Sequence, residues 1–226
     1  MKRWPALAFV TVLLLLNCTP PPHQLPDISP DFWRDAFGPA DISSVKGGGE
    51  VLVSLEGEKY VGAADVQWKK AGDFRANFYS VFGGQIASVS ADSESGTVIL
   101  EGKEYRVLLD EKMDSIPFSW GEDLTFRQFI SILTGRAPVN PADSGEAPDT
   151  ITISRRTAEA EWQRGQLRVT ARVNRRNERL EEIRYSFNQS WTVRMSDIFK
   201  GLARSVELRE DDRNYFWIKY QNLKPE

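Results

Sequence analysis

The sequence has a single cysteine and a single histidine, and both fall near its N-terminus. One cysteine cannot form an internal disulfide, so the fold must be stable without one. His23 is the only histidine, which excludes a Ser-His-Asp or Cys-His catalytic set and a Cys/His metal cluster from the rest of the chain. We therefore predict a protein that is not an enzyme and needs no cofactor or metal. A hydrolase that uses carboxylates alone is the alternative, although most acidic residues fall in expected turns.

The sequence also lacks an apolar run long enough to cross a membrane. Its longest such run, Ala6 to Leu16, has 11 residues, whereas a membrane-spanning helix needs about 20. Lys2 and Arg3 precede the run and polar residues follow it, as in a secretory signal. Removing residues 1–17 leaves 27 basic and 32 acidic residues, a net charge of −5. An acidic domain with no basic cluster argues against nucleic-acid binding.

Cys18 closes the apolar run and is followed by a proline-rich stretch that begins Thr19-Pro20-Pro21-Pro22. A lone cysteine in this place resembles the bacterial lipoprotein signal, in which the cysteine is freed by cleavage and acylated. Asn17 departs from the small residue that this signal prefers, so an ordinary cleaved signal or an uncleaved anchor is the alternative. The expected organisation is a signal peptide at 1–17, a lipid-anchored tether at 18–30 and a single domain at 31–226.

Most of the domain alternates apolar and polar residues in short segments separated by Gly, Asp, Ser or Asn. This pattern predicts antiparallel strands joined by hairpins. The predicted strands are 51–55, 60–68, 74–79, 86–91, 97–100, 105–109, 150–154, 158–163, 166–174, 180–188, 191–195, 206–209 and 215–220. Gly47-Gly48-Gly49 is expected to break the chain before the first strand. It lacks the lysine and Ser/Thr ending of a phosphate-binding loop.

Two helices are predicted as well. The first starts at Ser29 and Pro30 and has an apolar face that ends at Phe37. The second is capped by Asp123, places Phe126, Phe129, Ile130 and Leu133 at helical spacing, and stops at Gly135. This second helix interrupts the strands and needs an apolar surface to pack on. An unclosed, incomplete antiparallel β-barrel of about 11–12 strands with a helical plug or lid meets both requirements. A closed β-sandwich with an outer helix is the alternative.

The order of these features resembles the LolA/LolB-like lipoprotein-localisation family, closest to LolB, the outer-membrane lipoprotein receptor. Ser80-Val81-Phe82-Gly83 stands where the family has Ser-Pro-Leu-Gly, and Gly135-Arg136-Ala137-Pro138 stands at the exit of the family's helix. Trp191-Thr192-Val193 precedes the last strands, as in the family. The likeness covers nearly all of the mature chain, and its weight lies in the serial order because no single motif is diagnostic. Phe82 replaces the family's protruding leucine, and 140–149 looks like an insertion.

The resemblance implies two functional surfaces. One is a concave apolar cavity for acyl chains, since each buried CH₂ is worth about 0.8 kcal/mol. The residues expected to line it are Trp68, Phe78, Leu100, Phe129, Leu133, Tyr185 and Trp217. The alternative is that these residues fill a solid core. The other surface is a membrane-insertion loop formed by Val81, Phe82 and Gly83, with a buried hairpin-end aromatic as its alternative.

The same resemblance implies the partners and the location. The expected partners are the membrane, through lipid on Cys18, an acylated lipoprotein cargo and a periplasmic carrier protein. The expected location is the periplasmic face of the outer membrane, where a monomer would accept lipoproteins and insert them. A carrier of another lipid or glycolipid and a structural or interaction lipoprotein of the same fold remain alternatives.

Overall fold

A computed structural model covers the 226 residues of the chain and describes part of them: 32–33, 36–37, 42–55, 57–114, 116, 124–141, 146–187, 191–210 and 215–225. The predicted signal peptide, Cys18 and the tether lie outside these residues. In the described ranges, no helix has both the length and the apolar character that a membrane crossing requires. Because each described element lies between residues 32 and 225, a chain that begins at Thr19 keeps the whole described fold.

The described part of the chain forms one antiparallel sheet of 14 strands. The strands are β1 (Ser44–Leu55), β2 (Glu58–Lys69), β3 (Phe74–Ser80), β4 (Gln85–Ala91), β5 (Ser95–Leu100), β6 (Lys103–Leu108), β7 (Thr150–Ile153), β8 (Thr157–Arg164), β9 (Leu167–Asn174), β10 (Arg179–Phe187), β11 (Trp191–Phe199), β12 (Leu202–Arg209), β13 (Tyr215–Tyr220) and β14 (Lys224–Pro225). Their order is β6-β5-β4-β3-β2-β1-β13-β12-β11-β10-β9-β8-β7, with β14 beside β1.

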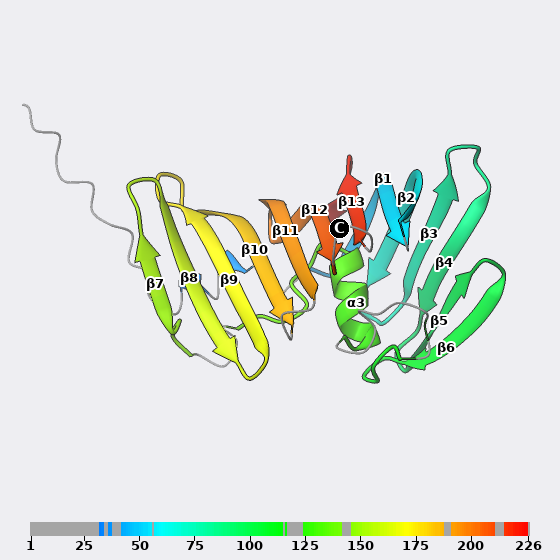
Figure 1. Cartoon of the computed structure of the whole chain (residues 1–226), viewed down its shortest axis with the longest axis horizontal. Coiled ribbons are helices and arrows are strands. Elements are labelled where there is room, and N and C mark those ends of the chain that lie inside the picture. Colours follow the sequence, from blue (N-terminus) through cyan, green and yellow to red (C-terminus); the bar gives the residue numbers. More distant parts are fainter. Residues whose placement is uncertain are drawn as a thin grey trace, which may run out of the picture.

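The sheet does not close on itself. Neighbours in the sheet are neighbours in the sequence except at its centre, where β1 pairs with β13 and joins the two halves. β6 and β7 form the two outer edges, far apart on opposite sides of the molecule (Figure 1). The prediction of an unclosed antiparallel β-barrel is therefore confirmed, and the sandwich alternative is wrong. The sheet has 14 strands rather than the predicted 11–12, because β7 and the two-residue β14 are counted with the longer strands.

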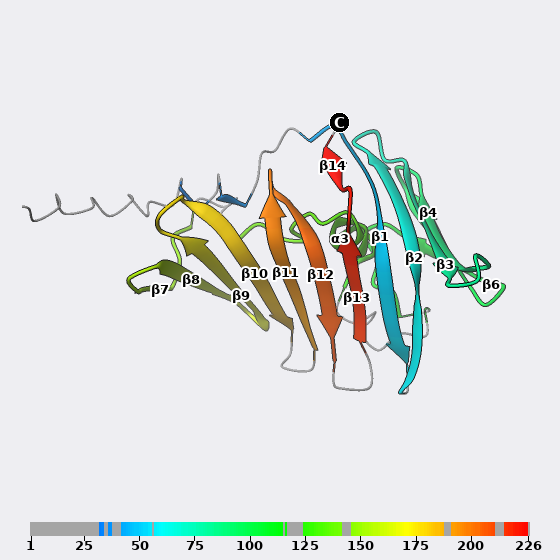
Figure 2. The same ribbon diagram turned by 90° about the horizontal axis from the view of Figure 1, so that it is seen from above.

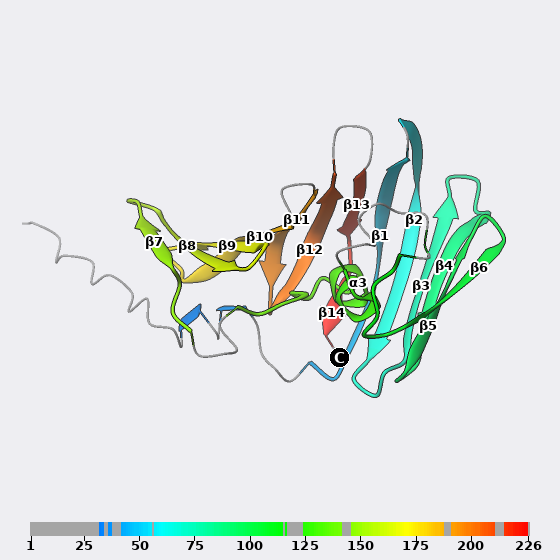
Figure 3. The ribbon, with the colours of Figure 1, turned by 60° about the horizontal axis from the view of Figure 1, so that its bottom comes forward.

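The sheet curves around one helix, α3 (Phe126–Leu133). Seen from above, the strands form a broad arc with α3 on its inner side (Figure 2). When the bottom of the molecule is brought forward instead, α3 is seen nearly end-on, between the half that ends at β6 and the half that ends at β7 (Figure 3). We call the side of the sheet that carries α3 the concave face and the opposite side the outer face.

Alternation along the strands divides the two faces. In β3, Phe74, Ala76 and Phe78 are buried, whereas Arg75 is exposed. β9 shows the same pattern, because Val169, Ala171 and Val173 are buried and alternate with arginine, threonine and asparagine residues that are not. Successive side chains of a strand point to opposite faces, so the apolar positions collect on the concave face. Together with the buried residues of α3 they form one hydrophobic core.

Several contacts hold α3 against the sheet. Thr125, rather than Asp123, is the N-cap: its side chain accepts from the Gln128 N–H, and the Gln128 side chain accepts from the Thr125 N–H. Asp123 itself lies outside the described residues. As predicted, Gly135 follows the end of the helix, with a φ of +70°.

The helix exit is bound to β12 and β13. Tyr220 donates its hydroxyl hydrogen to the Leu133 carbonyl. The Ala203 N–H donates to the Gly135 carbonyl at 2.7 Å. These bonds fix the end of α3 at the centre of the sheet, where the two halves meet.

The prediction that Gly47-Gly48-Gly49 breaks the chain is wrong, because β1 starts at Ser44 and runs through all three. The glycines instead allow β13 and the C-terminal segment to approach the β1 backbone closely. A Cβ on Gly49 would collide with the Lys219 backbone, and one on Gly47 would lie 2.8 Å from Leu223. A strand with side chains at these positions could not pass so close to β13 and the C-terminal segment.

The predicted first helix is described only in part. Residues 32, 33 and 36 are helical, and the Phe37 N–H donates to the Trp33 carbonyl at 3.1 Å. Trp33 and Phe37 both pack edge-on against Trp162 of β8, with ring centroids 5.6 and 5.8 Å away. Ser29 and Pro30 lie outside the described residues.

Candidate functional site on the concave face

Three of the expected lining residues lie on the concave face of β2–β5. Phe78 pairs with Ala64 of β2 and Ala87 of β4, and Ala87 pairs with Leu100 of β5. Residues directly paired across a sheet share a face, so all four lie on the side that carries α3. Trp68 lies on the same side, because it pairs with the buried Phe74.

The space above this row is not completely filled by the described side chains. Phe78 is buried, but Ala87 and Leu100 are only partly buried. Ala87 packs against the hydrophobic core, whereas Leu100 does not belong to the core or to the residues packed on it. The row thus passes from packed core at Phe78 to a partly exposed apolar surface at Leu100.

Phe129 and Leu133 are buried on α3 and face the same core. Tyr185 is fully buried on β10, where its hydroxyl donates to the Val139 carbonyl at 2.9 Å. Burial raises the pKa of Tyr185 well above its usual value, so the hydroxyl stays protonated and keeps this donor. The segment after α3 is thereby attached to β10 as well as to β12.

Trp217 lies apart from the other six residues. It stands between Phe216 and Ile218, which are buried, and pairs with Leu52 and Glu207. Alternation therefore places Trp217 on the outer face. The sequence pattern favoured an inward Trp217 because both residue sets of this strand are apolar or aromatic.

The positively charged side chain of Arg136 lies beside Trp68 on the concave face. The guanidinium carbon of Arg136 stands 3.5 Å from the ring centroid of Trp68, and its Nε donates to the Thr134 hydroxyl at 2.9 Å. Burial lowers the pKa of Arg136 to about 10, which still leaves it charged at neutral pH. No functional role was predicted for Arg136. Its place directly after the helix-ending Gly135 is the signal that puts it next to the concave face.

The predicted insertion loop is an exposed tight turn between β3 and β4. The Gly83 N–H donates to the Ser80 carbonyl at 2.9 Å, and the Ser80 N–H donates to the Gly84 carbonyl at 2.8 Å. Gly83 has a φ of +82°, which favours glycine here. Val81 and Phe82 occupy the tip and are 68% and 96% exposed. An exposed apolar tip is present, and the buried-aromatic alternative does not hold.

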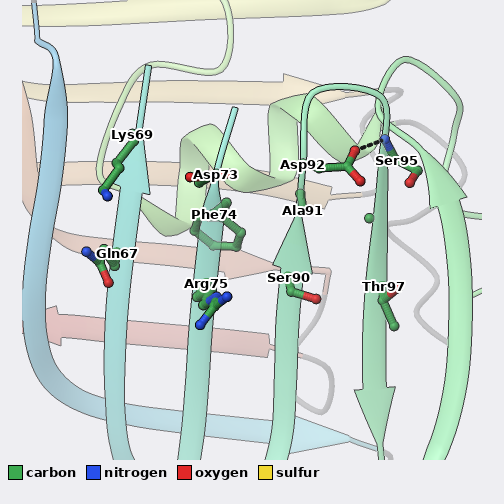
Figure 4. A pocket seen from close by; sticks show the side chains of 11 residues that line it. Gln67, Lys69, Asp73, Phe74, Arg75, Ser90, Ala91, Asp92, Ser95 and Thr97 are labelled. Carbon is green, nitrogen blue, oxygen red and sulfur yellow. Dashed lines mark hydrogen bonds between the residues drawn. The ribbon is translucent and has the colours of Figure 1, made fainter. Parts of the chain in front are cut away.

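A polar pocket of about 500 Å³ lies on the outer face of β2–β5 and was not predicted. Figure 4 shows Gln67, Arg75, Ser90 and Thr97 side by side on four neighbouring strands. Asp92 closes one end: its carboxylate accepts from the Glu94 and Ser95 N–H groups, and these bonds hold its pKa below the usual value. Gln67, Arg75, Ser90 and Thr97 alternate with residues of the concave face, so this pocket lies on the other side of the sheet. Its charged and hydroxyl side chains do not suit acyl chains.

A second polar cluster on the outer face surrounds Glu182, whose side chain is only 7% exposed. Its carboxylate accepts hydrogen bonds from Arg172, Arg184 and Arg194, on β9, β10 and β11. Burial alone would raise the pKa of Glu182, but the three guanidiniums, Arg194 first among them, outweigh burial and lower it. The cluster joins three strands of the second half of the sheet.

The lowered pKa predicts acid-sensitive stability. Glu182 contributes stability above its unfolded-state pKa of about 4.3, and this contribution is lost as the pH falls through its lower folded-state pKa. Glu182→Gln should lower the free energy of unfolding at pH 7 by about 1–3 kcal/mol, as expected for hydrogen bonds to charged groups. Urea unfolding of both proteins should show that the difference shrinks below about pH 4.

Glu161→Gln is the matched control, because its partner Arg168 is more than half exposed. An exposed pair contributes about 0–1 kcal/mol, so this variant should stay close to the unchanged protein. An equal loss in both variants would contradict a special role for Glu182.

The described residues contain no group of three or more His, Cys, Asp or Glu side chains placed to hold a metal ion.

No protein-family model and no curated protein matches this sequence. Solved structures do match. A LolA superfamily protein from Nitrosomonas europaea is 9% identical, with a TM-score of 0.52 over 87% of this chain and 92% of that one. The chain therefore has a LolA-like fold. A DUF1329 family protein from Desulfovibrio piger is 12% identical, with a TM-score of 0.52 over 87% and 91%. An outer membrane lipoprotein-sorting protein domain from Vibrio parahaemolyticus is 6% identical, with a TM-score of 0.47 over 87% and 91%.

Proposed function

We propose that this protein is a lipid-anchored receptor that binds the acyl chains of lipoproteins on its concave face and inserts them into the outer membrane. The observation that carries the proposal is the partly exposed apolar surface at Ala87 and Leu100 on the concave face. An unclosed sheet leaves such a surface accessible from its rim. Acyl chains are a fitting ligand because they gain about 0.8 kcal/mol per buried CH₂ and need no specific polar partner.

The hairpin tip supports the insertion step. Val81 and Phe82 project from a turn that is held by two backbone hydrogen bonds. These two side chains can therefore enter a membrane without removing any apolar contact from the core. This tip, together with acylated Cys18, would hold the rim of the concave face against the lipid. We assign it the role that the protruding leucine has in LolB, at the periplasmic face of the outer membrane.

Native mass spectrometry of the chain from Thr19 to Glu226 tests the acyl site directly. A palmitoylated peptide should form a one-to-one complex, and the same peptide without palmitate should not. Burial of the chain supplies on the order of 10 kcal/mol before entropic costs, so the acyl group should decide binding. If both peptides bind equally well, or if neither binds, the core is filled and the protein is better explained as a tethered interaction domain.

A carrier of another lipid is the second candidate, favoured by the same apolar surface. Transfer of an acylated protein from a soluble carrier to vesicles separates the two functions. The receptor function requires transfer, whereas a carrier of glycolipids would bind its lipid without accepting the acylated protein.

A further inference from the structure

The side chain of Arg136 is held in place by contacts on two of its sides. Its guanidinium lies over the Trp68 ring, with 3.5 Å between the guanidinium carbon and the ring centroid. Its Nε donates to the Thr134 hydroxyl at 2.9 Å. Thr134 is fully buried, and its own hydroxyl donates to the Ile130 carbonyl at 2.9 Å. The stacking and the hydrogen bond to a buried residue therefore leave the guanidinium little freedom to turn.

The two Nη groups of Arg136 have no partner among the described residues. The bond from Nε to Thr134 is the one hydrogen bond that this side chain makes there. Arg136 is partly buried, and burial alone lowers its pKa, with no contribution from a neighbouring carboxylate. Four N–H donors of a fixed guanidinium are therefore free to bind a ligand.

Other arginines of the protein direct their guanidinium groups at carboxylates. Arg127 donates from Nε and Nη2 to the two carboxylate oxygens of Asp110, at 2.7 and 3.1 Å. Arg194 donates from the same two nitrogens to Glu182. Arg136 instead directs Nε at a neutral hydroxyl. A partly buried cation without a counter-ion costs free energy, which a bound anion would offset.

The residues next to Arg136 are apolar. Trp68, under the guanidinium, and Ala137, the next residue in the chain, are partly exposed and pack against the hydrophobic core. The buried Leu223 lies beside Gly135, where a Cβ would come within 2.9 Å of its side chain. A single cation at an apolar surface suits an amphipathic anion. The charged end of such a ligand pairs with the guanidinium, and its apolar part covers the neighbouring side chains.

We propose that Arg136 binds the anionic group of an amphipathic ligand, a carboxylate or a phosphate, through its two Nη groups. Parallel N–H···O bonds from one guanidinium match the geometry of either anion. The inference goes beyond the proposed acyl binding, because an acyl ester or amide carries no charge and would leave this site unused. The ligand class is an anionic lipid, such as a fatty acid or a phospholipid.

The test compares ligands that share one alkyl chain and differ in charge, by isothermal titration calorimetry with the chain from Thr19 to Glu226. They are decanoate, decyl phosphate and the uncharged decanamide, with inorganic phosphate as an anion without a chain. Decanoate, decyl phosphate or both should bind about tenfold or more tightly than decanamide, as expected for charge-assisted hydrogen bonds. Inorganic phosphate should bind more weakly than decyl phosphate, because it covers none of the apolar surface. Equal affinities of the two phosphates would overturn an amphipathic ligand.

Arg136→Gln removes the guanidinium and should abolish the difference between the charged and uncharged ligands. Arg136→Lys keeps the charge without the paired N–H groups and should keep only part of that difference. Arg75→Gln is the matched control, since it removes the same charge from the outer face of β3, between the uncharged Gln67 and Ser90. It should bind all four ligands as the unchanged protein does.

Equal binding of the charged ligands and decanamide to the unchanged protein overturns the inference, and so does the absence of binding by all of them. This comparison does not depend on the folding of any variant. An equal loss in Arg136→Gln and Arg75→Gln also overturns it, because net charge rather than a site then attracts the anion. The acyl-binding function is judged separately, by the palmitoylated peptide, so the two can fail independently.

Discussion

Replacing Leu100 with glutamate is expected to lower the affinity for a palmitoylated peptide at least tenfold while the fold stays intact. Leu100 lies on the concave face next to Ala87, is partly exposed, and does not belong to the packed core. A carboxylate there keeps its contact with water in the empty protein but must lose it when an acyl chain lies over it. Desolvating an unpaired charge costs several kcal/mol, which corresponds to a tenfold loss or more. Titration calorimetry gives the affinity, and urea unfolding gives the stability.

Ile99→Glu is the matched control for Leu100→Glu. Ile99 is the preceding residue of β5, is exposed, and points to the outer face. The two variants add the same charge one residue apart on opposite faces. Ile99→Glu should bind the acylated peptide as the unchanged protein does. An equal loss in both variants would mean that the negative charge acts from a distance, and unchanged binding in both would remove the concave face from the acyl site.

The strand content was predictable because alternation is a local property. In β3 and β9, the alternating apolar positions Phe74, Ala76, Phe78, Val169, Ala171 and Val173 are buried in the structure. The helix was predictable for the same reason, since Phe126, Phe129, Ile130 and Leu133 recur at helical spacing and all are buried. The unclosed barrel followed from these two patterns, because an apolar helix amid antiparallel strands needs a concave surface to pack on.

The errors occurred where a residue's role depends on a distant segment. Gly49 serves the close approach of Lys219, which lies far away in the sequence. β14 is a two-residue strand that only its pairing with Val45 and Lys46 defines. Trp217 alternates with Phe216 and Ile218, so hydrophobicity could not say which face it takes. Pairing partners decide these cases, and a single sequence does not contain them.

The candidate site divides in the same way. Burial of Phe78, Phe129, Leu133 and Tyr185 was predictable from apolar spacing. The partial exposure of Leu100 and the stacking of Arg136 on Trp68 were not, because both depend on which distant segments pack over these residues. The position of β7 at the edge of the described strands was also unpredictable, since Thr150–Ile153 has the same alternation as an internal strand.

Changing Phe82 to glutamate is expected to reduce vesicle binding by the chain from Thr19 to Glu226 about tenfold or more. Phe82 is 96% exposed at the tip of the β3–β4 turn, so its side chain contributes almost nothing to the core. Inserting a phenylalanine into the membrane interface gains about 1.5–3 kcal/mol, which the carboxylate forfeits. Co-sedimentation with outer-membrane-like vesicles gives the binding, and thermal unfolding should show an unchanged transition.

Phe199→Glu is the control that makes this result specific to the tip. Phe199 is also an exposed aromatic residue next to a hairpin turn, but the β11–β12 turn lies at the opposite end of the strands from the β3–β4 turn. If Phe82 inserts into the membrane, Phe199→Glu leaves vesicle binding unchanged, because its end of the sheet faces away from the lipid. Equal losses in the two variants would show a general effect of charge. Unfolding of Phe82→Glu alone would show that the tip stabilises the hairpin, and the membrane role would then be wrong.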